Sequence, residues 1–408
     1  MRRLMSFLGI LFMVGLSGVA PLTADEASTE PPKQPTSFGE ALKQGEIHLG
    51  LRYRYEFVDE EPRDQDAHAS TLRTALGYKS KAYKGFSITL EAENVSVIGD
   101  EDKYRNLGAG SLSNGVFDRP VVADPEITEL TQATLRYATE STTLDIGRRR
   151  INLDNQRFVG AVAWRQHHQT FDGVVLEQRS ISNTKITYAF LDQVNRIFGD
   201  GRGMASHLLN VAVDLGGVNS KLVGYAYLLD YDPGLTALST ATYGLRFNTG
   251  KKIFAELEVA QQSEHGDNNS NVDVGYYKAG IGAKTGAWTI QANREILEGA
   301  PGEGRFQTPL ATLHKFNGWA DKFLNTPGNG LVDTWVTLRY AKGPWSGDAT
   351  YHVFESDSFS IDYGTEVNAS VSYKSPWKQV FAAKAAFYDA DQFSFDTDKV
   401  WVWTSWGF

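Results

Sequence analysis

Arginine side chains are concentrated in one stretch of the sequence, residues 147–172. It begins with three consecutive arginines, Arg148, Arg149 and Arg150, and continues with Arg157 and Arg165. A guanidinium group is planar and presents a fork of donors that can hold both oxygens of a carboxylate at once. The chemistry that this stretch predicts is therefore the binding of anionic groups.

Two adjacent histidines, His167 and His168, lie in the same stretch. They suggest a metal site, but adjacent residues of a strand point to opposite sides, and a third ligand is not evident from the sequence. We therefore expect no metal ion and no cofactor. A phosphate-cradling glycine loop is also not found, which argues against direct use of ATP.

A second stretch, residues 305–323, mixes charged and aromatic side chains. An aromatic ring can stack on the apolar face of a sugar while neighbouring charges bind its polar edge. The alternative is a structured loop with a small core of its own, although long loops without a function are uncommon. The charged members are Arg305, His314, Lys315, Asp321 and Lys322, and the aromatic members are Phe306, Phe316, Trp319 and Phe323.

The elements that must position these stretches are β-strands. From residue 46 onward, segment after segment alternates apolar and polar side chains with a period of two. The pattern predicts about eighteen strands, with an uncertainty of about two. Short connections alternate with long ones. The predicted fold class is therefore all-β, a transmembrane antiparallel up-and-down β-barrel with short periplasmic turns and long extracellular loops.

The alternation also assigns a face to each charged side chain. An Arg or Lys facing lipid at mid-depth costs about 2–4 kcal/mol, so the charges must face the lumen. They could pair and stiffen the wall, or the arginines could form a constriction that favours anions. The predicted lumenal cations are Arg52, Arg54, Arg73, Arg136, Arg246, Lys278, Arg339 and Lys384, and the predicted lumenal carboxylates are Glu91, Glu93, Glu129, Asp145, Glu256, Glu258, Asp333 and Glu366.

The two ends of the sequence support export and membrane insertion. Residues 1–24 have the charged, apolar and small-residue regions of a secretory signal peptide. Residues 25–44 form a predicted periplasmic segment with a short helix at 38–43, and residues 45–408 form the barrel. The final strand, 399–408, is expected to pair with the first, 46–56, and to bring Trp401 and Trp403 beside Arg52 and Arg54.

Composition excludes several classes of function. The formal net charge is −9 and no basic patch is evident, so we expect no nucleic-acid partner. There are no cysteines, so disulfides cannot stabilise the exported chain. A hydrolase would need a nucleophile beside a base. Its candidates are His352 with Ser370 or Ser372, but a lumenal histidine near serines is more often polar lining, and we expect no enzyme.

Residues 147–174 and 306–333 resemble motifs of the alginate export family of outer-membrane porins, and residues 37–56 resemble its opening. The resemblance covers about residues 37–408, although this chain is shorter than the best-known alginate exporters. It implies a monomeric barrel in the outer membrane of a Gram-negative bacterium, whose arginine-lined lumen passes an anionic polysaccharide such as a polyuronate. The family positions it matches are Arg52, Arg54, Arg149, Arg157, Arg165, Asp172, His314, Trp319, Asp321 and Lys322.

Two functions remain open at this point. One is passive passage of an alginate-like polysaccharide, and the alternative is an uptake porin for small anionic nutrients. Both have the same expected partners, which are the anionic solute, outer-membrane lipid with lipopolysaccharide, and the barrel assembly machinery.

Overall fold

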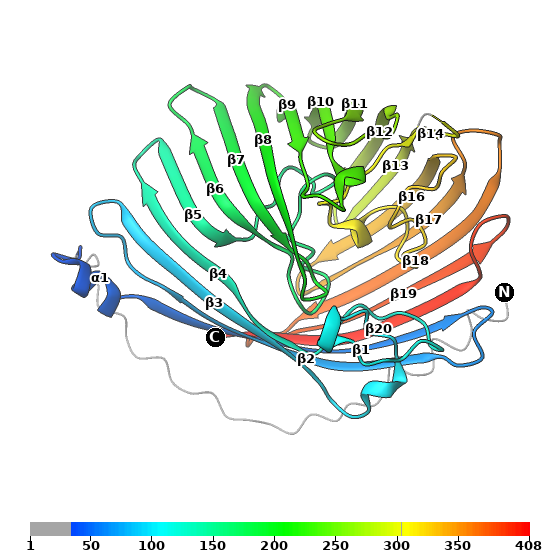
Figure 1. The fold of residues 1–408 in the computed structure, drawn as a ribbon, viewed down its shortest axis with the longest axis horizontal. Coiled ribbons are helices and arrows are strands. Elements are labelled where there is room, and N and C mark those ends of the chain that lie inside the picture. Colours follow the sequence, from blue (N-terminus) through cyan, green and yellow to red (C-terminus); the bar gives the residue numbers. More distant parts are fainter. Residues whose placement is uncertain (1–33, 303) are drawn as a thin grey trace. The chain divides into compact units, whose positions relative to one another are not determined.

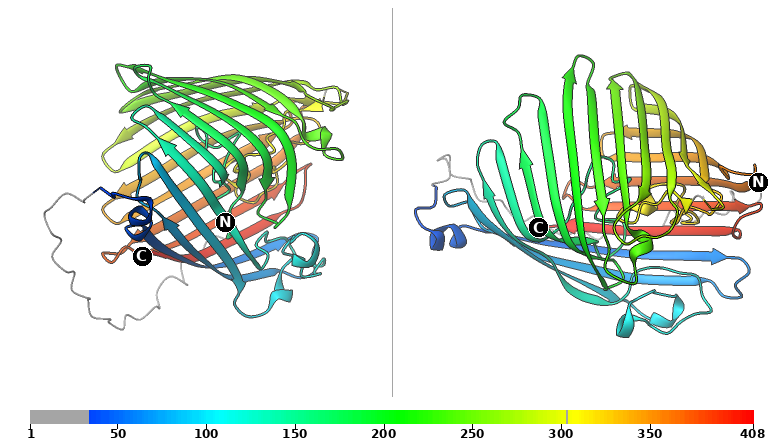
Figure 2. Two further views of the ribbon diagram at one scale, coloured as in Figure 1. Left: turned by 60° about the vertical axis from the view of Figure 1, so that its left-hand side comes forward. Right: turned by 45° about the horizontal axis from the view of Figure 1, so that its top comes forward.

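A computed structural model describes residues 34–302 and 304–408 of the chain. The unit formed by residues 35–408 is a closed antiparallel β-barrel of 18 strands, in which the last long strand pairs with the first. Figure 1 and Figure 2 show this barrel from three directions. The predicted fold class and strand number are confirmed. The proposed signal peptide lies outside the described residues and stays a prediction.

The strands of the barrel agree closely with the alternating segments of the sequence. Two further strands, β14 and β15, form a separate small hairpin within the long connection between β13 and β16. The bounds of the barrel strands are β1 Glu46–Glu60, β2 Ala67–Lys79, β3 Phe86–Val97, β4 Ile127–Ala138, β5 Thr142–Arg149, β6 Thr170–Gln178, β7 Thr184–Asn195, β8 Gly201–Gly216, β9 Ser220–Leu229, β10 Thr240–Gly250, β11 Ile253–Glu264, β12 Asp273–Thr285, β13 Trp288–Leu297, β16 Leu331–Lys342, β17 Trp345–Glu355, β18 Asp362–Lys374, β19 Val380–Ala390 and β20 Thr397–Gly407; β14 is Gly299–Ala300 and β15 Gly304–Arg305.

Few helical residues accompany the strands. The helix α1, Phe38–Lys43, precedes β1 as predicted, and the Ser37 side chain caps it by accepting a hydrogen bond from the amide of Glu40. The Tyr78 hydroxyl of β2 donates to the carbonyl of Leu42 and holds the helix end to the barrel. The single-turn 3₁₀ helices are η3 Glu101–Lys103, η4 Gly110–Leu112, η5 Thr236–Leu238 and η6 Leu313–Lys315.

In the part of the chain that the structure describes, no helix has the length and apolar character needed to cross a membrane.

Alternate residues of each strand face opposite sides of the wall, as the period of two requires. Ile281 and Leu245 stand on the outer face, 62% and 54% exposed, while Glu93 and Asp333 are fully buried on the inner face. The apolar outer face suits a hydrocarbon environment, and closure leaves no strand edge unpaired there. Charged side chains such as Glu93 and Asp333 therefore lie on the inner face of the strands, whereas the role of the predicted cations as pore lining stays a prediction.

The pairing of β1 with β20 closes the barrel in the predicted way. Arg54 lies directly opposite Trp403 and Glu56 lies directly opposite Trp401. Both tryptophans therefore share the lumenal face with the arginines of β1.

Candidate pore constriction and vestibule

Two long connections fold into the barrel and meet there. We call residues 150–169 inner loop A and residues 306–330 inner loop B. Val159 and Leu310 form a parallel bridge between them, and the amide of Gly160 donates to the carbonyl of Leu310 at 2.9 Å. The side-chain amide of Gln169 donates to the carbonyl of Gly160 and to the carbonyl of Leu310. The sequence alone could not say whether residues 294–331 enter the lumen.

Inner loop A is held to the wall by two buried arginines. Arg165 pairs with Glu56 of β1 at 3.2 Å and with Asp321 of inner loop B at 3.1 Å. Arg157 pairs with Glu295 of β13 at 3.1 Å and donates to the side chain of Asn317 at 3.1 Å. These two arginines, which belong to the resemblance-derived set, join a loop to strands on different sides of the lumen.

Inner loop B is held by carboxylates of the wall. Glu366 of β18 accepts hydrogen bonds from the backbone amides of Trp319 and Ala320, at 2.5 and 3.0 Å. Gly318 has φ +83°, and a Cβ atom there would lie 2.2 Å from a carboxylate oxygen of Glu366. Only glycine meets both the backbone conformation and the close approach. Asn317 adds hydrogen bonds to Glu295 and Asp333.

Apolar packing supports these polar anchors. Phe158 of inner loop A and Phe306 of inner loop B pack together with Tyr276 of β12, with ring centroids 5.4–5.9 Å apart. Phe323 of inner loop B stacks on Phe393 at 5.2 Å and contacts Phe354 of β17 at 4.5 Å. The two loops thus have a core of their own, continuous with the wall.

Six of the nine predicted arginines form ion pairs, some within the wall and some between a loop and the wall. Arg136 and Arg149 share Asp145 of β5, and Arg246 pairs with Glu256 at 2.7 Å. Asp172 is the partner of Arg148, at 2.7 Å, rather than an open acceptor. Arg54 pairs with Asp124 of the connection between β3 and β4. The geometry of these residues therefore agrees with the structural alternative, in which paired charges stiffen the barrel.

Arg52, Arg73 and Arg339 differ from that group. Across residues 34–302 and 304–408, no carboxylate lies within ion-pair distance of any of the three. Arg52 and Arg73 are direct cross-strand neighbours on β1 and β2, and Arg52 donates only to the neutral side chain of Gln166 and to backbone carbonyls of inner loop A. The three therefore carry positive charge that no ion pair of the described chain neutralises, although Glu93 attracts both Arg52 and Arg73 from a greater distance.

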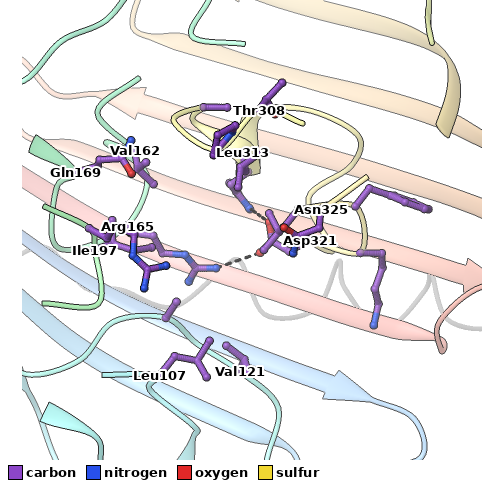
Figure 3. A pocket seen from close by; sticks show the side chains of 18 of the residues that line it. Leu107, Val121, Val162, Arg165, Gln169, Ile197, Thr308, Leu313, Asp321 and Asn325 are labelled. Carbon is purple, nitrogen blue, oxygen red and sulfur yellow. Dashed lines mark hydrogen bonds and ion pairs between the residues drawn. The ribbon is translucent and has the colours of Figure 1, made fainter. Parts of the chain in front are cut away.

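A cavity of about 570 Å³ lies between the inner loops and the connections after β3 and β7. Figure 3 shows Leu107 and Val121 on one side of it and Thr308 and Leu313 on another, with Arg165 and Asp321 joined between them. We call this cavity the vestibule. Cations outnumber carboxylates in its lining; the cations are Arg157, Arg165, Arg196, Arg202, Arg305, Lys322 and Lys399, and the carboxylates are Glu60 and Asp321.

Two vestibule arginines have open guanidinium groups. Arg202 is the second residue of β8 and Arg305 lies on β15. Both side chains are half-buried. No carboxylate of the described chain lies within ion-pair distance of either one, whereas Arg196 is bound by Asp200 at 2.5 Å. Sequence reasoning did not select Arg196 or Arg202; the available signal was two arginines six residues apart around a strand end. Arg305 was recognised only as part of its stretch.

Burial and neighbouring charges shift the titration of the inner loops. Burial, together with the nearby Lys384, lowers the pKa of His314 to about 3, against the opposing effect of Asp321. Burial opposes ionisation of Asp321, but contacts with His314, Lys399 and Arg165 hold its pKa well below its usual range. Burial also lowers the pKa of Lys322, which nevertheless pairs with Glu60 at 2.6 Å.

The histidine pair of inner loop A binds a carboxylate of the wall. His167 and His168 lie outside the strands, and both approach Glu93 of β3, so the expectation that they point to opposite sides was wrong. Burial lowers the pKa of His168 to about 4; the pKa of His167 is raised in spite of burial, by its contacts with Glu129 and Glu93. No group of three potential ligands suited to a metal is found among the described side chains.

The residues considered for hydrolysis do not form a nucleophile–base pair. His352 contacts Asp333 at 2.9 Å. Ser370 donates to Asp348 at 2.7 Å, and Ser372 pairs with Ser346. The geometry offers no support for that alternative.

Comparison with known proteins gives the fold its context. No protein-family model matches the sequence, and no curated protein matches it. Among solved structures, Pseudomonas aeruginosa OpdK, in a crystal structure with vanillate, superposes with a TM-score of 0.72 at 12% identity, over 90% of this chain and 99% of that one. P. aeruginosa OpdO superposes with a TM-score of 0.69 at 14% identity (90% and 98%), and OpdL with 0.67 at 15% (90% and 99%).

These neighbours correct one prediction and support another. The resemblance to the alginate export family was wrong: no family model matches, and the similar solved structures named above are Opd proteins. The motif matches were local, and arginine pairs that hold a loop inside a barrel can produce them without a shared cargo. OpdK is described as an outer-membrane protein. Barrel and neighbours together place this chain in the outer membrane, with the architecture of a porin.

Proposed function

We propose that the protein is a passive outer-membrane channel for small organic anions, carboxylates above all. The observation that carries this proposal is the vestibule, where the open guanidinium groups of Arg202 and Arg305 lie among the apolar side chains of Leu107, Ile197 and Leu238. A guanidinium group binds a carboxylate through two parallel hydrogen bonds, and apolar neighbours accept the organic body of the solute. This corresponds to the uptake alternative and not to polysaccharide passage.

The size of the vestibule supports a small solute. A volume of about 570 Å³ falls within the roughly 300–1,000 Å³ usual for small-molecule sites. The inner loops occupy much of the lumen and are anchored by buried ion pairs at several points. A solute that fits between them must be compact.

A second group of cations lies beyond the vestibule. Arg52 and Arg73 carry positive charge without a carboxylate partner in the described chain, on the wall that inner loop A contacts. Arg52 donates to backbone carbonyls of inner loop A, so these guanidinium groups lie beside a loop that also borders the vestibule. Conduction requires sites that bind well enough to attract the solute and weakly enough to release it, and two separated pairs of arginines satisfy that requirement.

The crystal structure of OpdK with vanillate offers an analogy, since vanillate is a small aromatic carboxylate. At 12% identity this similarity concerns the fold alone. Lipopolysaccharide contacts, dependence on the barrel assembly machinery and a monomeric state remain proposals. Absence of catalysis also remains a prediction.

The test is made with the purified protein in planar bilayers. We expect a reversal potential in a KCl gradient that indicates anion preference, and a reduction of single-channel current by benzoate but not by a neutral sugar. The double variant Arg202→Gln/Arg305→Gln should weaken benzoate block several-fold, because a partly exposed guanidinium–carboxylate contact is worth about 0.2–1 kcal/mol in water and two such contacts are lost.

The matched control is Arg179→Gln. Arg179 lies in the short connection between β6 and β7, at the other end of the barrel, and is exposed apart from a contact with Glu177. It should leave the block unchanged. Cation preference that persists from pH 5 to pH 8, or equal block by benzoate and sugar, would overturn the proposed function.

A further inference from the structure

The ammonium group of Lys384 lies in a cage of three tryptophans inside the barrel. Its Nζ atom is 3.8 Å from the ring centroid of Trp319, 4.1 Å from that of Trp164 and 5.1 Å from that of Trp401. Lys384 belongs to β19 and Trp401 to β20, whereas Trp164 belongs to inner loop A and Trp319 to inner loop B. One cation thus contacts both inner loops and the wall at once, through attraction to the indole faces.

Within the described chain, the only hydrogen bond of this ammonium group runs to His314. Lys384 Nζ lies 2.7 Å from His314 Nε2, and His314 Nδ1 lies 2.6 Å from Asp321 Oδ1. An ammonium group can only donate, so Nε2 must accept and Nδ1 must carry the proton that is donated to Asp321. His314 is therefore neutral, with a fixed tautomer, and its pKa of about 3 agrees with this assignment.

The chain of contacts continues back to the wall. The second oxygen of Asp321 accepts from Lys399 of β20 at 2.9 Å and from Arg165 of inner loop A at 3.1 Å. Trp164 is also held from β1, where Arg54 lies 4.9 Å from its ring centroid and donates to its carbonyl at 2.6 Å. Three neighbouring strands of the wall thereby hold both loops through one connected set of side chains.

The charge of Lys384 is not presented to a passing solute. The residue is 7% exposed, and the tryptophans and His314 surround its ammonium group. Lys278 offers a contrast: it also lies near a tryptophan, Trp335, and its ion pair is with Glu256, so both of these partners are wall residues. Loss of Lys384 would remove contacts to both inner loops, whereas loss of Lys278 would remove contacts within the wall only.

We propose that Lys384 is a positioning residue of the pore: together with His314 and the three tryptophans it forms a latch that fixes both inner loops against the wall and so sets the width of the passage between them. The vestibule lies between those loops, so its shape depends on the latch. The effect of the latch on anion preference rests on the function proposed above. Its effect on loop position and conductance does not.

The test compares Lys384→Met with the wild-type protein. Methionine keeps the length and apolar packing of the side chain but removes the charge and the donor. We expect larger and noisier single-channel currents, a smaller anion preference, and trypsin cleavage at Arg157, Lys315 or Lys322 in a barrel that still shows heat-modifiable migration on gels. Lys384→Arg, which restores a cation and a donor, should recover most of the trypsin resistance.

The control Lys278→Met should retain wild-type noise and trypsin resistance. If Lys384→Met fails to fold, His314→Gln provides the same test from the loop side, because it breaks the link to Asp321 without changing the wall. Wild-type noise and trypsin resistance in whichever of these latch variants folds would overturn the proposal. A wild-type channel without anion preference would overturn the proposed function only, since the noise and cleavage results would still report on the latch.

Discussion

Both the vestibule and the latch contain cations, yet these cations have different environments. In the vestibule, Arg202 and Arg305 are half-buried, border a cavity, and lack carboxylate partners in the described chain. In the latch, Lys384 is buried among indole rings, and Arg165, which is linked to the latch through Asp321, is buried between carboxylates. The comparison shows that the sign of a lumenal charge says little about its role. Burial and the identity of the partners decide whether it meets a solute or holds a loop.

The largest expected effect is that of Arg165→Met, which removes the shared partner of Glu56, Asp124 and Asp321. Loss of one member of a buried ion-pair network leaves the remaining charges uncompensated, which costs about 3–5 kcal/mol. We therefore expect a clear loss of stability in denaturant titrations of the protein in phospholipid vesicles. Arg202→Gln, measured in parallel, should change stability by less than about 0.5 kcal/mol. Equal losses for the two variants would remove the distinction between the two regions.

Acid should weaken the latch before it affects the vestibule arginines. The pKa of His314 is about 3 in the folded protein and about 6.5 in an opened loop, so the opened loop binds more protons as the pH falls. The stabilisation from neutral His314 is complete above about pH 6.5 and is lost progressively toward pH 3. Asp321, whose pKa is also lowered, acts in the same direction at the acid end. The cationic side chains of Lys384 and Arg165, which lie close to His314, oppose its protonation.

The measurement is current noise and trypsin resistance between pH 7 and pH 4. We expect noise to rise and resistance to fall on acidification in the wild-type protein, whereas His314→Gln should show a flat dependence. His167, whose pKa is raised, works in the opposite direction in inner loop A, because its stabilising charge is lost as the pH rises. A wild-type profile identical to that of His314→Gln would show that His314 does not control the latch.

The sequence predicted the wall far better than the lumen. Strand alternation is a local signal, because lipid on one side and polar lumen on the other select side chains at every second residue. This explains why β6, Thr170–Gln178, and the closing pair Arg54 and Trp403 were predicted correctly. The paths of inner loops A and B depend on contacts such as Arg157 with Glu295, between residues 138 positions apart, which no local pattern specifies.

The same reasoning explains the errors in the candidate site. An arginine in a motif looks identical whether it is free or paired, so Arg149 and Arg246 were selected although their partners are wall carboxylates. Arg202 lies in no motif and was missed, although it borders the vestibule. A cluster of arginines in the sequence therefore indicates a polar lumen. Whether each arginine is available to a solute or pairs with the wall depends on its partners in three dimensions.

The smallest expected effect is that of Arg339→Gln, which tests whether an unpaired arginine outside the vestibule affects anion binding. Arg339 was predicted to line the pore, and it is exposed near the short-turn end of β16, with no carboxylate of the described chain within ion-pair distance. Like Arg202 and Arg305, Arg339 has no carboxylate partner in the described chain, but its side chain is exposed and does not line the vestibule. At an effective dielectric constant near that of water, a charge about 4 Å away contributes only about 1 kcal/mol, and salt screens it further. We expect less than a twofold change in benzoate block and a slightly reduced anion preference in low-salt reversal-potential measurements. An effect as large as that of the Arg202→Gln/Arg305→Gln double variant would mean that an unpaired charge suffices for selectivity, and that the enclosing walls of the vestibule are unnecessary.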